Sequence, residues 1–315
     1  MSVSVIPESV TVTEVCPRDG FQSLPTNIPL QEKVEIVNEI INCGFKQIEV
    51  TSFVHPKAIP QLKDADELLQ RVDRSNGVQL RALVPNLIGL ERAIKAKVDK
   101  IKLMLSATDS HSLSNANRTT FDAMEDFKPL IDRAKEAGMP VSGSISVVFG
   151  CPYEGEVPIS RILQVSEKYA GLGVTSISLA DTTGMGNPVK VRKIIKAIKK
   201  EFPEFEFSLH LHNTRGMAFA NALVGLEEGI VNFDSSVAGL GGCPYAPNAS
   251  GNISSEDLIH ALHEMGIETG IDLDRVIEIG KKLEKEFPEN SDSFILKAGK
   301  CSDLHLAPKE QVKLG

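Results

Sequence analysis

Residues 176–212 read SISLADTTGMGNPVKVRKIIKAIKKEFPEFEFSLHLH, and this stretch decides the fold. A short β-rich run at 176–180 precedes a polar turn and then a helical pattern at 188–201. Within that pattern Ile194, Ile195 and Ile198 form one apolar face, so we interpret the basic run VRKIIKAIKK as a solvated helix face. A second β-rich run follows at 207–212. This strand–helix–strand order predicts parallel strands that are covered by helices.

The same unit repeats along the whole chain. We expect strands at residues 10–16, 47–52, 80–84, 100–105, 141–148, 176–180, 207–212 and 232–236. We expect helices at residues 30–43, 59–71, 87–96, 120–137, 159–172, 188–201, 216–228 and 255–265. Eight units without a break in composition predict an α/β fold, a closed (β/α)8 TIM barrel with a short C-terminal helical extension. An open doubly wound sheet is the rival, but its GxGxxG turn is missing, since Arg18-Asp19-Gly20 follows the first strand.

Composition limits the possible partners and compartments. The 315 residues carry a net charge of −8, which argues against a nucleic-acid partner or an anionic membrane surface. Five scattered cysteines, the lack of a signal-peptide pattern and the lack of a long apolar run predict a cytoplasmic protein with reduced thiols. We expect a catalytic barrel over residues 1–271, with a helix at 273–285 and a tail up to residue 315 packed on it.

Polar residues cluster where the predicted strands end, which is where barrels of this kind build active sites. His210 and His212 are two residues apart on a strand and therefore project from the same face. Alone, they are better explained as hydrogen-bonded core histidines, and Asp19 reverses this preference. Asp19 ends the first strand, which lies near the seventh in a closed barrel, and its carboxylate favours a metal such as Mn²⁺ or Mg²⁺.

Further candidates occupy the same rim. Arg18 is expected to be a fixed donor for a developing oxyanion, with a surface ion pair as the alternative. Glu49 either holds Arg18 in place or takes part in catalysis, and Asp181 is expected to support the metal site or orient Thr182. Cys243, in the glycine-rich loop 239–252, is either a small buried hydrophobe or an acid that protonates a carbanion.

Two histidines outside this rim, His260 and His263, lie three residues apart on a predicted helix. They are candidate metal ligands, but no third ligand is apparent nearby in the sequence. We therefore favour an exposed helix face.

At this point a family resemblance is evident. The motifs PRDGFQ (17–22), EVTSFV (49–54), GCPYEG (150–155), ADTTG (180–184), HLHNT (210–214) and DSSVAGLGGCPYA (234–246) resemble, in the same order, those of 3-hydroxy-3-methylglutaryl-CoA (HMG-CoA) lyases. They span nearly the whole chain, and the last is long and specific.

The resemblance implies a set of residue roles. It makes Asp19, His210, His212 and Asn252 the ligands of a divalent metal, Mg²⁺ or Mn²⁺. It makes Arg18, His210, Cys243 and Glu49 catalytic residues, with Arg18 at the enolate oxygen and His210 in proton transfer. We further expect Arg18, Gln22, Asp181 and Thr182 to bind the substrate.

The implied reaction is a retro-Claisen cleavage of a carbon–carbon bond, as in leucine degradation. An acyl-CoA substrate, HMG-CoA or a close 3-hydroxy-3-carboxymethyl-acyl-CoA, would give acetyl-CoA and a 3-oxo acid such as acetoacetate. We expect a homodimer without nucleic-acid or membrane partners.

The chain departs from the family pattern at residues 23–26 (SLPT), 213–215 (NTR) and 247–248 (PN). These changes leave the ligands intact and concern the substrate. One hypothesis is that Leu24 and Pro25 give the acyl group an apolar border that favours a longer C3 substituent than methyl. The alternatives to a lyase are a Claisen condensing enzyme of the isopropylmalate or citramalate synthase type, a metal-dependent aldolase, and a non-catalytic acyl-CoA-binding barrel.

Overall fold

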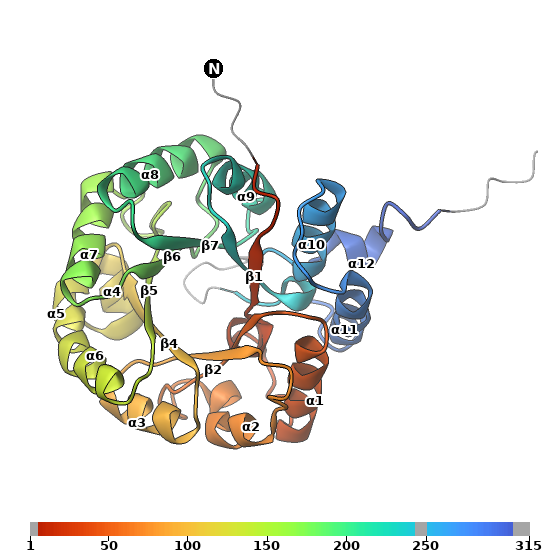
Figure 1. Ribbon diagram of the computed structural model, residues 1–315, viewed down its shortest axis with the longest axis horizontal. Helices are drawn as coiled ribbons and strands as arrows, with labels where there is room; N and C mark the ends of the chain where they lie inside the picture. The colour runs from red at the N-terminus through yellow and green to blue at the C-terminus, as the bar shows by residue number, and fades with distance from the viewer. Residues whose placement is uncertain (1–5, 243–250, 305–315) are drawn as a thin grey trace, which may run out of the picture.

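The computed structural model describes residues 6–242 and 251–304, and its centre is a closed barrel of eight parallel strands in chain order (Figure 1). The (β/α)8 prediction is confirmed. The strands are β1 Thr11–Glu14, β2 Gln47–Ser52, β3 Gln79–Leu83, β4 Lys100–Ser106, β5 Val141–Ser146, β6 Ser176–Asp181, β7 Glu206–Leu211 and β8 Asn232–Ser235. The bounds of each strand lie within two residues of the predicted ones. The barrel closes where Thr11 to Glu14 pair with Asn232 to Ser235.

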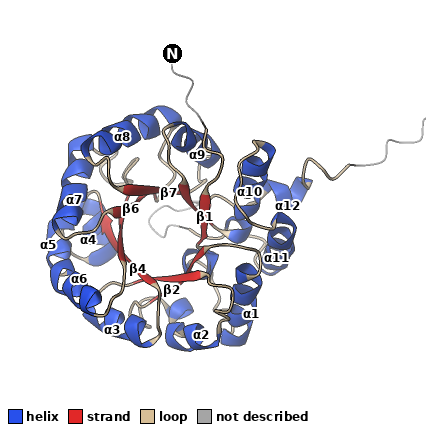
Figure 2. Cartoon of the chain, viewed as in Figure 1, coloured by secondary structure: helices blue, strands red, loops and turns tan. Residues whose placement is uncertain are grey.

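Helices form an outer ring around the strands (Figure 2). They are α1 Leu30–Ile41, α2 Ala65–Arg71, α3 Leu87–Lys95, α4 Asp109–Ala116, α5 Thr120–Glu125, α6 Phe127–Glu136, α7 Ile159–Gly171, α8 Pro188–Glu201, α9 Ala218–Glu227, α10 Ser255–Glu264, α11 Leu273–Glu286 and α12 Phe294–Ala298. Two helices were predicted too long. The one at 59–71 is a 3₁₀ turn, η2 (Pro60–Leu62), followed by α2, and the one at 120–137 is α5 followed by α6. The prediction also missed α4 and α12.

The segment after β1 differs most from the prediction. Residues 16–20 form a π-helical turn, η1 (Cys16–Gly20), where the sequence pattern suggested that the strand continues through Cys16. The carbonyl oxygen of Val15 accepts from the N–H groups of Arg18, Asp19 and Gly20. The chain is thus turned sharply at the barrel rim, and π turns of this kind are common at functional sites. As a result Arg18 and Asp19 lie within a tight turn and not at the end of a strand.

The core lies between the barrel and its helices. Strand residues such as Ile48, Leu80, Ile101 and Leu209 are fully buried, and α11 packs its apolar face against α1 and α10. Helix α12 packs on α10 and α11, so the predicted C-terminal helical extension is confirmed. None of the helices in residues 6–242 and 251–304 is long and apolar enough to cross a bilayer.

Candidate active site

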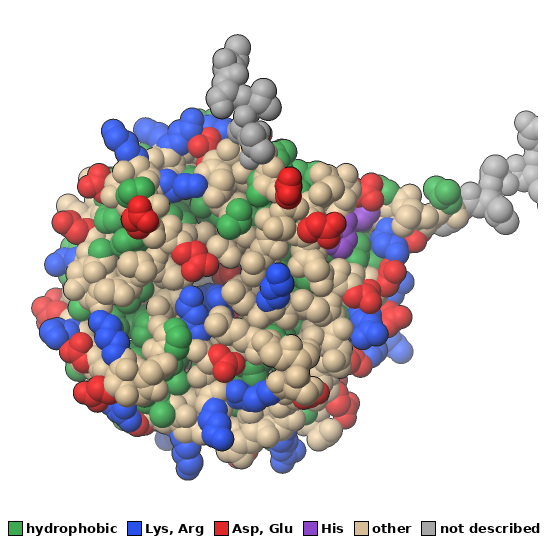
Figure 3. All heavy atoms as spheres, in the orientation of Figure 1, with side chains coloured by type: hydrophobic (Ala, Val, Ile, Leu, Met, Phe, Trp, Pro, Cys, Tyr) green, Lys and Arg blue, Asp and Glu red, His purple; other side chains and the backbone are tan. Residues whose placement is uncertain are grey.

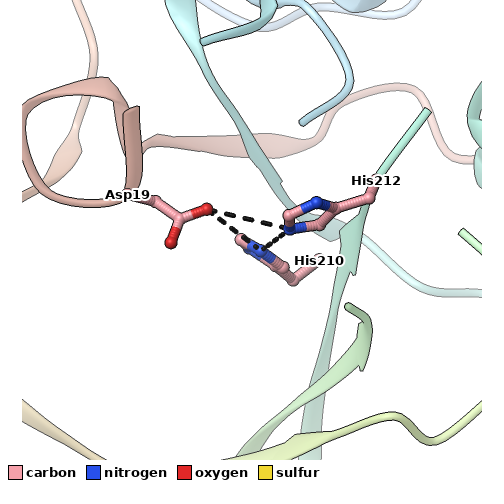
Figure 4. Close-up of side chains that lie close together, drawn as sticks. All are labelled: Asp19, His210 and His212. Carbon is pink, nitrogen blue, oxygen red and sulfur yellow. Dashed lines mark hydrogen bonds and ion pairs between the residues drawn. The ribbon is translucent and has the colours of Figure 1, made fainter. Parts of the chain in front are cut away.

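Three side chains aim their ligand atoms at one point at the rim of the barrel (Figure 4). His210 is the fifth residue of β7 and His212 follows the strand, so their rings lie on the same face. Their Nε2 atoms are 3.1 Å apart, and Asp19 Oδ2 lies 3.7 Å from Nε2 of His210 and 3.8 Å from Nε2 of His212. The structure therefore brings together three of the four predicted ligands, from η1, β7 and the residue after β7's end.

The fourth predicted ligand, Asn252, lies beside them. Asn252 Nδ2 donates to Asp19 Oδ2 at 2.8 Å and to the carbonyl oxygen of Leu240 at 3.0 Å. Its buried Oδ1 has no hydrogen-bond partner, and neither has the buried Nδ1 of His212. Buried polar atoms are rarely left without a partner unless the site binds something.

The donor set and its spacing fit a divalent cation. Two metal–nitrogen bonds of about 2.1 Å at a right angle place the nitrogens about 3.0 Å apart, which is close to the separation of the two histidines. Burial and the nearby His210 lower the pKa of His212 to about 4, so its ring is neutral and has a lone pair available. Burial alone would raise the pKa of the Asp19 carboxyl, but Arg18 and the two histidines hold it well below its usual range. Asp19 and His212 are thus in the protonation states that a metal needs.

A buried network of charges supports His210 from below. His210 Nδ1 lies 3.2 Å from Asp234 Oδ2 on β8, and Lys102 Nζ of β4 lies 3.3 Å from the same oxygen. Lys102 also pairs with Glu49, which in turn accepts from Arg18 Nε. Burial would raise the pKa of Asp234, but Lys102 and His210 lower it well below its usual range.

Sequence reasoning missed Lys102 and Asp234. Lys102 lies in β4, where a charged residue is usually exposed, and Asp234 begins the motif at 234–246 but was given no role of its own.

Arg18 is buried and not part of a surface ion pair. It contacts Glu49 and Asp19, so the structure favours the interpretation in which Glu49 holds Arg18 in place. Burial opposes its charge, yet the pKa of Arg18 stays above its ordinary value because Asp19 and Glu49 are adjacent. The guanidinium group is therefore a fixed positive charge next to the three convergent ligand atoms.

Two further buried carboxyl groups, also missed by sequence reasoning, connect the segments around the site. Glu14 accepts from the N–H of Cys16 in η1 at 2.8 Å and from the N–H of Val237 at 3.0 Å. Glu256 accepts from the N–H of Ala238 at 3.0 Å, in the 3₁₀ turn η3 (Val237–Gly239) that follows β8. Burial raises the pKa of Glu14 to about 7 and that of Glu256 to about 8.

The remaining predicted residues have local partners. Asp181 accepts from the N–H groups of Met185 and Gly186, and burial raises its pKa to about 6. Thr182 Oγ1 accepts from the N–H of Val147, whose φ is +54°. These contacts shape the loops after β5 and β6, and the carbonyl oxygen of Asp181 also accepts from the N–H of His212 at 3.4 Å. The expected role of Asp181 in supporting the metal site stays a prediction. Gln22 follows η1 and is half-buried, whereas Cys243 lies outside the described residues.

The hypothesis that Leu24 borders the acyl group is wrong, whereas Pro25 is exposed and its part in the hypothesis stays a prediction. Leu24 is only 1% exposed and belongs to the hydrophobic core, so it offers no surface to a ligand. The π-helical turn and the residues after it direct this side chain inward, while Ser23 Oγ donates to the carbonyl oxygen of Gly20 at 2.8 Å.

Comparison with known proteins identifies the family of the chain. The family model described as HMGL-like matches residues 9–283. The chain is 39% identical over 296 residues to hydroxymethylglutaryl-CoA lyase YngG of Bacillus subtilis, covering 94% of this chain and 99% of the relative. It is 39% identical to the cytoplasmic 3-hydroxy-3-methylglutaryl-CoA lyase of Rattus norvegicus, covering 94% of this chain and 86% of the relative.

A solved structure shares the whole architecture. The HMG-CoA lyase of Acinetobacter baumannii, in complex with coenzyme A and 3-methylmalate, superposes with a TM-score of 0.91 and 39% identity. The match covers 98% of this chain and 100% of that one. A family model that covers most of the chain and relatives at this identity agree, so the chain is an enzyme that belongs to the HMGL-like lyase family.

Proposed function

We propose that the protein is a divalent-metal-dependent lyase that cleaves HMG-CoA, or a close 3-hydroxy-3-carboxymethyl-acyl-CoA, into acetyl-CoA and a 3-oxo acid. The observation that carries the proposal is the convergence of Asp19, His210 and His212 directly beside the buried guanidinium of Arg18. The names of the relatives and the coenzyme A bound to the A. baumannii enzyme support the substrate class.

The metal and Arg18 are proposed to stabilise negative charge on different oxygens of the substrate. Asp19, His210, His212 and Asn252 would hold the cation, Mg²⁺ or Mn²⁺. When bound there, such a cation lowers the pKa of the substrate's tertiary hydroxyl group and polarises a neighbouring oxygen. Arg18 donates to the thioester oxygen as enolate charge develops on it, and Glu49 keeps the guanidinium in that position.

Proton transfer needs a base for the hydroxyl group and an acid for the carbanion that leaves. His210 is proposed to take part in moving the first proton, as the family resemblance implies, and Asp234 holds its ring in place for this role. Cys243 is proposed to protonate the carbanion. Gln22, Asp181 and Thr182 are proposed to contact the substrate or to shape the loops that do so.

Assembly and location stay predictions. We propose a homodimer in the cytoplasm, and the relatives include both cytoplasmic and mitochondrial forms. A boundary between a catalytic barrel at residues 1–271 and an appended segment at 272–315 is likewise a prediction.

The test is turnover of HMG-CoA by the purified full chain. With Mg²⁺ or Mn²⁺ we expect equal amounts of acetyl-CoA and acetoacetate, and no product after treatment with EDTA. When the protein is incubated with acetyl-CoA and a 2-oxo acid, no free CoA should be released. A condensing enzyme would release CoA under these conditions, so this measurement separates it from a lyase. A metal-loaded, folded protein that binds HMG-CoA without cleaving it would support a non-catalytic barrel and overturn the proposal.

A further inference from the structure

A second group of metal-binding side chains lies far along the chain from the proposed active site. His260 and Glu264 lie one turn apart on α10, and Cys301 follows α12. One ligand atom from each lies within 4.8 Å of the other two. The sequence pattern favoured an exposed helix face for His260 because it showed no third ligand, but the fold supplies Glu264 and Cys301.

The spacing suits direct coordination. His260 Nε2 lies 3.3 Å from Cys301 Sγ. Tetrahedral zinc, with bonds of about 2.05 Å to nitrogen and about 2.3 Å to sulfur, separates these atoms by about 3.5 Å. Zinc would therefore require the two side chains to move apart by only a few tenths of an ångström. His260 and Glu264 already share one helix face, since residues four apart are neighbours.

Fixed contacts hold Cys301 opposite α10. Asp257, in the first turn of α10, accepts from Ser293 Oγ at 2.9 Å and from the N–H of Ile295 at 2.8 Å, and so docks the start of α12. After α12 the chain turns at Gly299, whose φ is +80°. The N–H of Lys300 then donates to Asp303 Oδ2 at 2.8 Å, and its ammonium group pairs with Asp274 of α11. His260 and Glu264 thus lie on α10, and Cys301 lies on a segment that these contacts hold against it.

The site is also accessible. Glu264 and Cys301 are exposed and His260 is half-buried. Figure 3 shows histidine side chains at the surface between α10 and α12, the two helices that lie beside each other on the outside of the barrel in Figure 1. A cation can therefore enter from solvent, and water can complete the fourth position.

We propose that His260, Glu264 and Cys301 form a second metal site, which binds Zn²⁺ and ties the segment after α12 to α10. A thiolate, an imidazole and a carboxylate together favour Zn²⁺, whereas the oxygen and imidazole donors of Asp19, Asn252 and the two rim histidines suit Mg²⁺ or Mn²⁺. The two sites are distinguished by their sulfur ligand.

Cobalt spectroscopy on the full chain tests the sulfur ligand. Reduced, metal-free protein is titrated with Co²⁺, and thiolate coordination is read from its near-ultraviolet charge-transfer absorption. This absorption should be present in wild type and in Cys243→Ser, and absent in Cys301→Ser. Absorption that survives in Cys301→Ser would overturn the proposal.

Zinc affinity tests the remaining ligands. It is measured by calorimetry in a His212→Ala background, which weakens the rim site. Changes to groups that only orient a ligand cost about 10- to 100-fold in affinity, so Cys301→Ser and His260→Gln should each cost at least about tenfold. His263→Gln, on the same helix and hydrogen-bonded to Thr269, is the matched control and should bind as the parent does.

A loss below tenfold in both Cys301→Ser and His260→Gln would overturn the site. Urea unfolding of each variant in EDTA checks the fold. These side chains lie at the surface, so the unfolding midpoints without metal should be the same.

Discussion

His210 Nδ1 lies 3.2 Å from Asp234 Oδ2, and this contact turns Nε2 of the same ring toward Asp19 and His212. A carboxylate behind a metal-binding histidine fixes its tautomer and orientation. Asp234 is itself held by Lys102, so the ring is oriented by a charge network that spans β4, β7 and β8.

We therefore predict that Asp234→Asn lowers metal affinity or kcat/KM by about 10- to 100-fold, because the amide orients the ring less strongly and removes a charge. Metal binding by calorimetry and HMG-CoA cleavage measure the effect. Asp132→Asn, at an exposed pair with Lys128 on α6, is the control and should match wild type. Unchanged affinity and turnover in Asp234→Asn would contradict a positioning role.

Removal of a direct ligand should have a larger effect. His212→Ala is expected to lose bound Mg²⁺ or Mn²⁺ and, with it, HMG-CoA cleavage, because one imidazole of the convergent set is gone. Metal content after dialysis is the measurement, and the far-ultraviolet circular dichroism should stay that of wild type. Full activity in a His212→Ala protein that holds no metal would sink the assignment.

Arg18→Lys keeps a positive charge beside Glu49 and Asp19 but loses the planar fork of donors. We expect kcat to fall by about 100-fold or more, the scale on which single oxyanion donors act. Steady-state kinetics with saturating Mn²⁺ measure the change, and Arg92→Lys, which alters the half-buried pair with Asp66, is the control. A kcat within about threefold of wild type would leave Arg18 a structural residue.

Stability should fall with rising pH because of Glu256. Burial raises its pKa from an ordinary 4.5 to about 8. Between these values the folded state binds a proton that the unfolded state lacks, so the free energy of unfolding decreases as pH rises. Glu14 acts with the same sign up to about pH 7. The stabilisation is complete below about pH 4.5 and lost above about pH 8.

Glu256→Gln should therefore flatten this pH dependence. The amide can still accept from the N–H of Ala238 and donate to Ser254, so the neutral contacts are kept. Urea unfolding at several pH values between 5 and 8 should show a slope smaller than that of wild type by about 1 kcal/mol per pH unit. Exposed Glu278→Gln is the control, and an identical slope in all three proteins would refute the prediction.

Leu24→Ala should affect stability and not substrate choice. The side chain is in the core, so its truncation is expected to cost about 2–5 kcal/mol in the free energy of unfolding. The ratio of kcat/KM for HMG-CoA to that for an analogue with a longer C3 substituent should equal the wild-type ratio. If the ratio changed and the free energy of unfolding did not, Leu24 would have to contact the acyl group after all.

The barrel was predictable because each strand and helix has its own local signal. The β-rich run at 47–52 and the amphipathic helix at 188–201 match β2 and α8 residue for residue. His210 and His212 were predictable for the same reason, since the period of a strand alone places them on one face. Asp19 needed one more inference, the closure that brings the first strand near the seventh.

The features that the sequence did not predict depend on the folded backbone and on contacts between residues that are distant in sequence. Lys102 and Asp234 are 132 positions apart and meet only inside a closed barrel. Three N–H groups share the carbonyl oxygen of Val15 in η1, a geometry that no residue pattern signals. Leu24 follows this turn and its side chain enters the core, whereas the next residues, 25–27, are exposed.

The junction of β1 with β8 has a consequence for how the protein matures. Asp19 follows the first strand, whereas Asn252 follows the last, so this contact forms when segments 233 residues apart in the chain meet at the closure of the ring. Such distant pairings are slow to form because loop closure costs entropy before the contacts reward it. A ligand that binds only the closed ring shifts the equilibrium toward it. A cation held by these two residues would therefore stabilise the closed barrel over partly folded states. A newly made chain would bind the cation only after the barrel has closed.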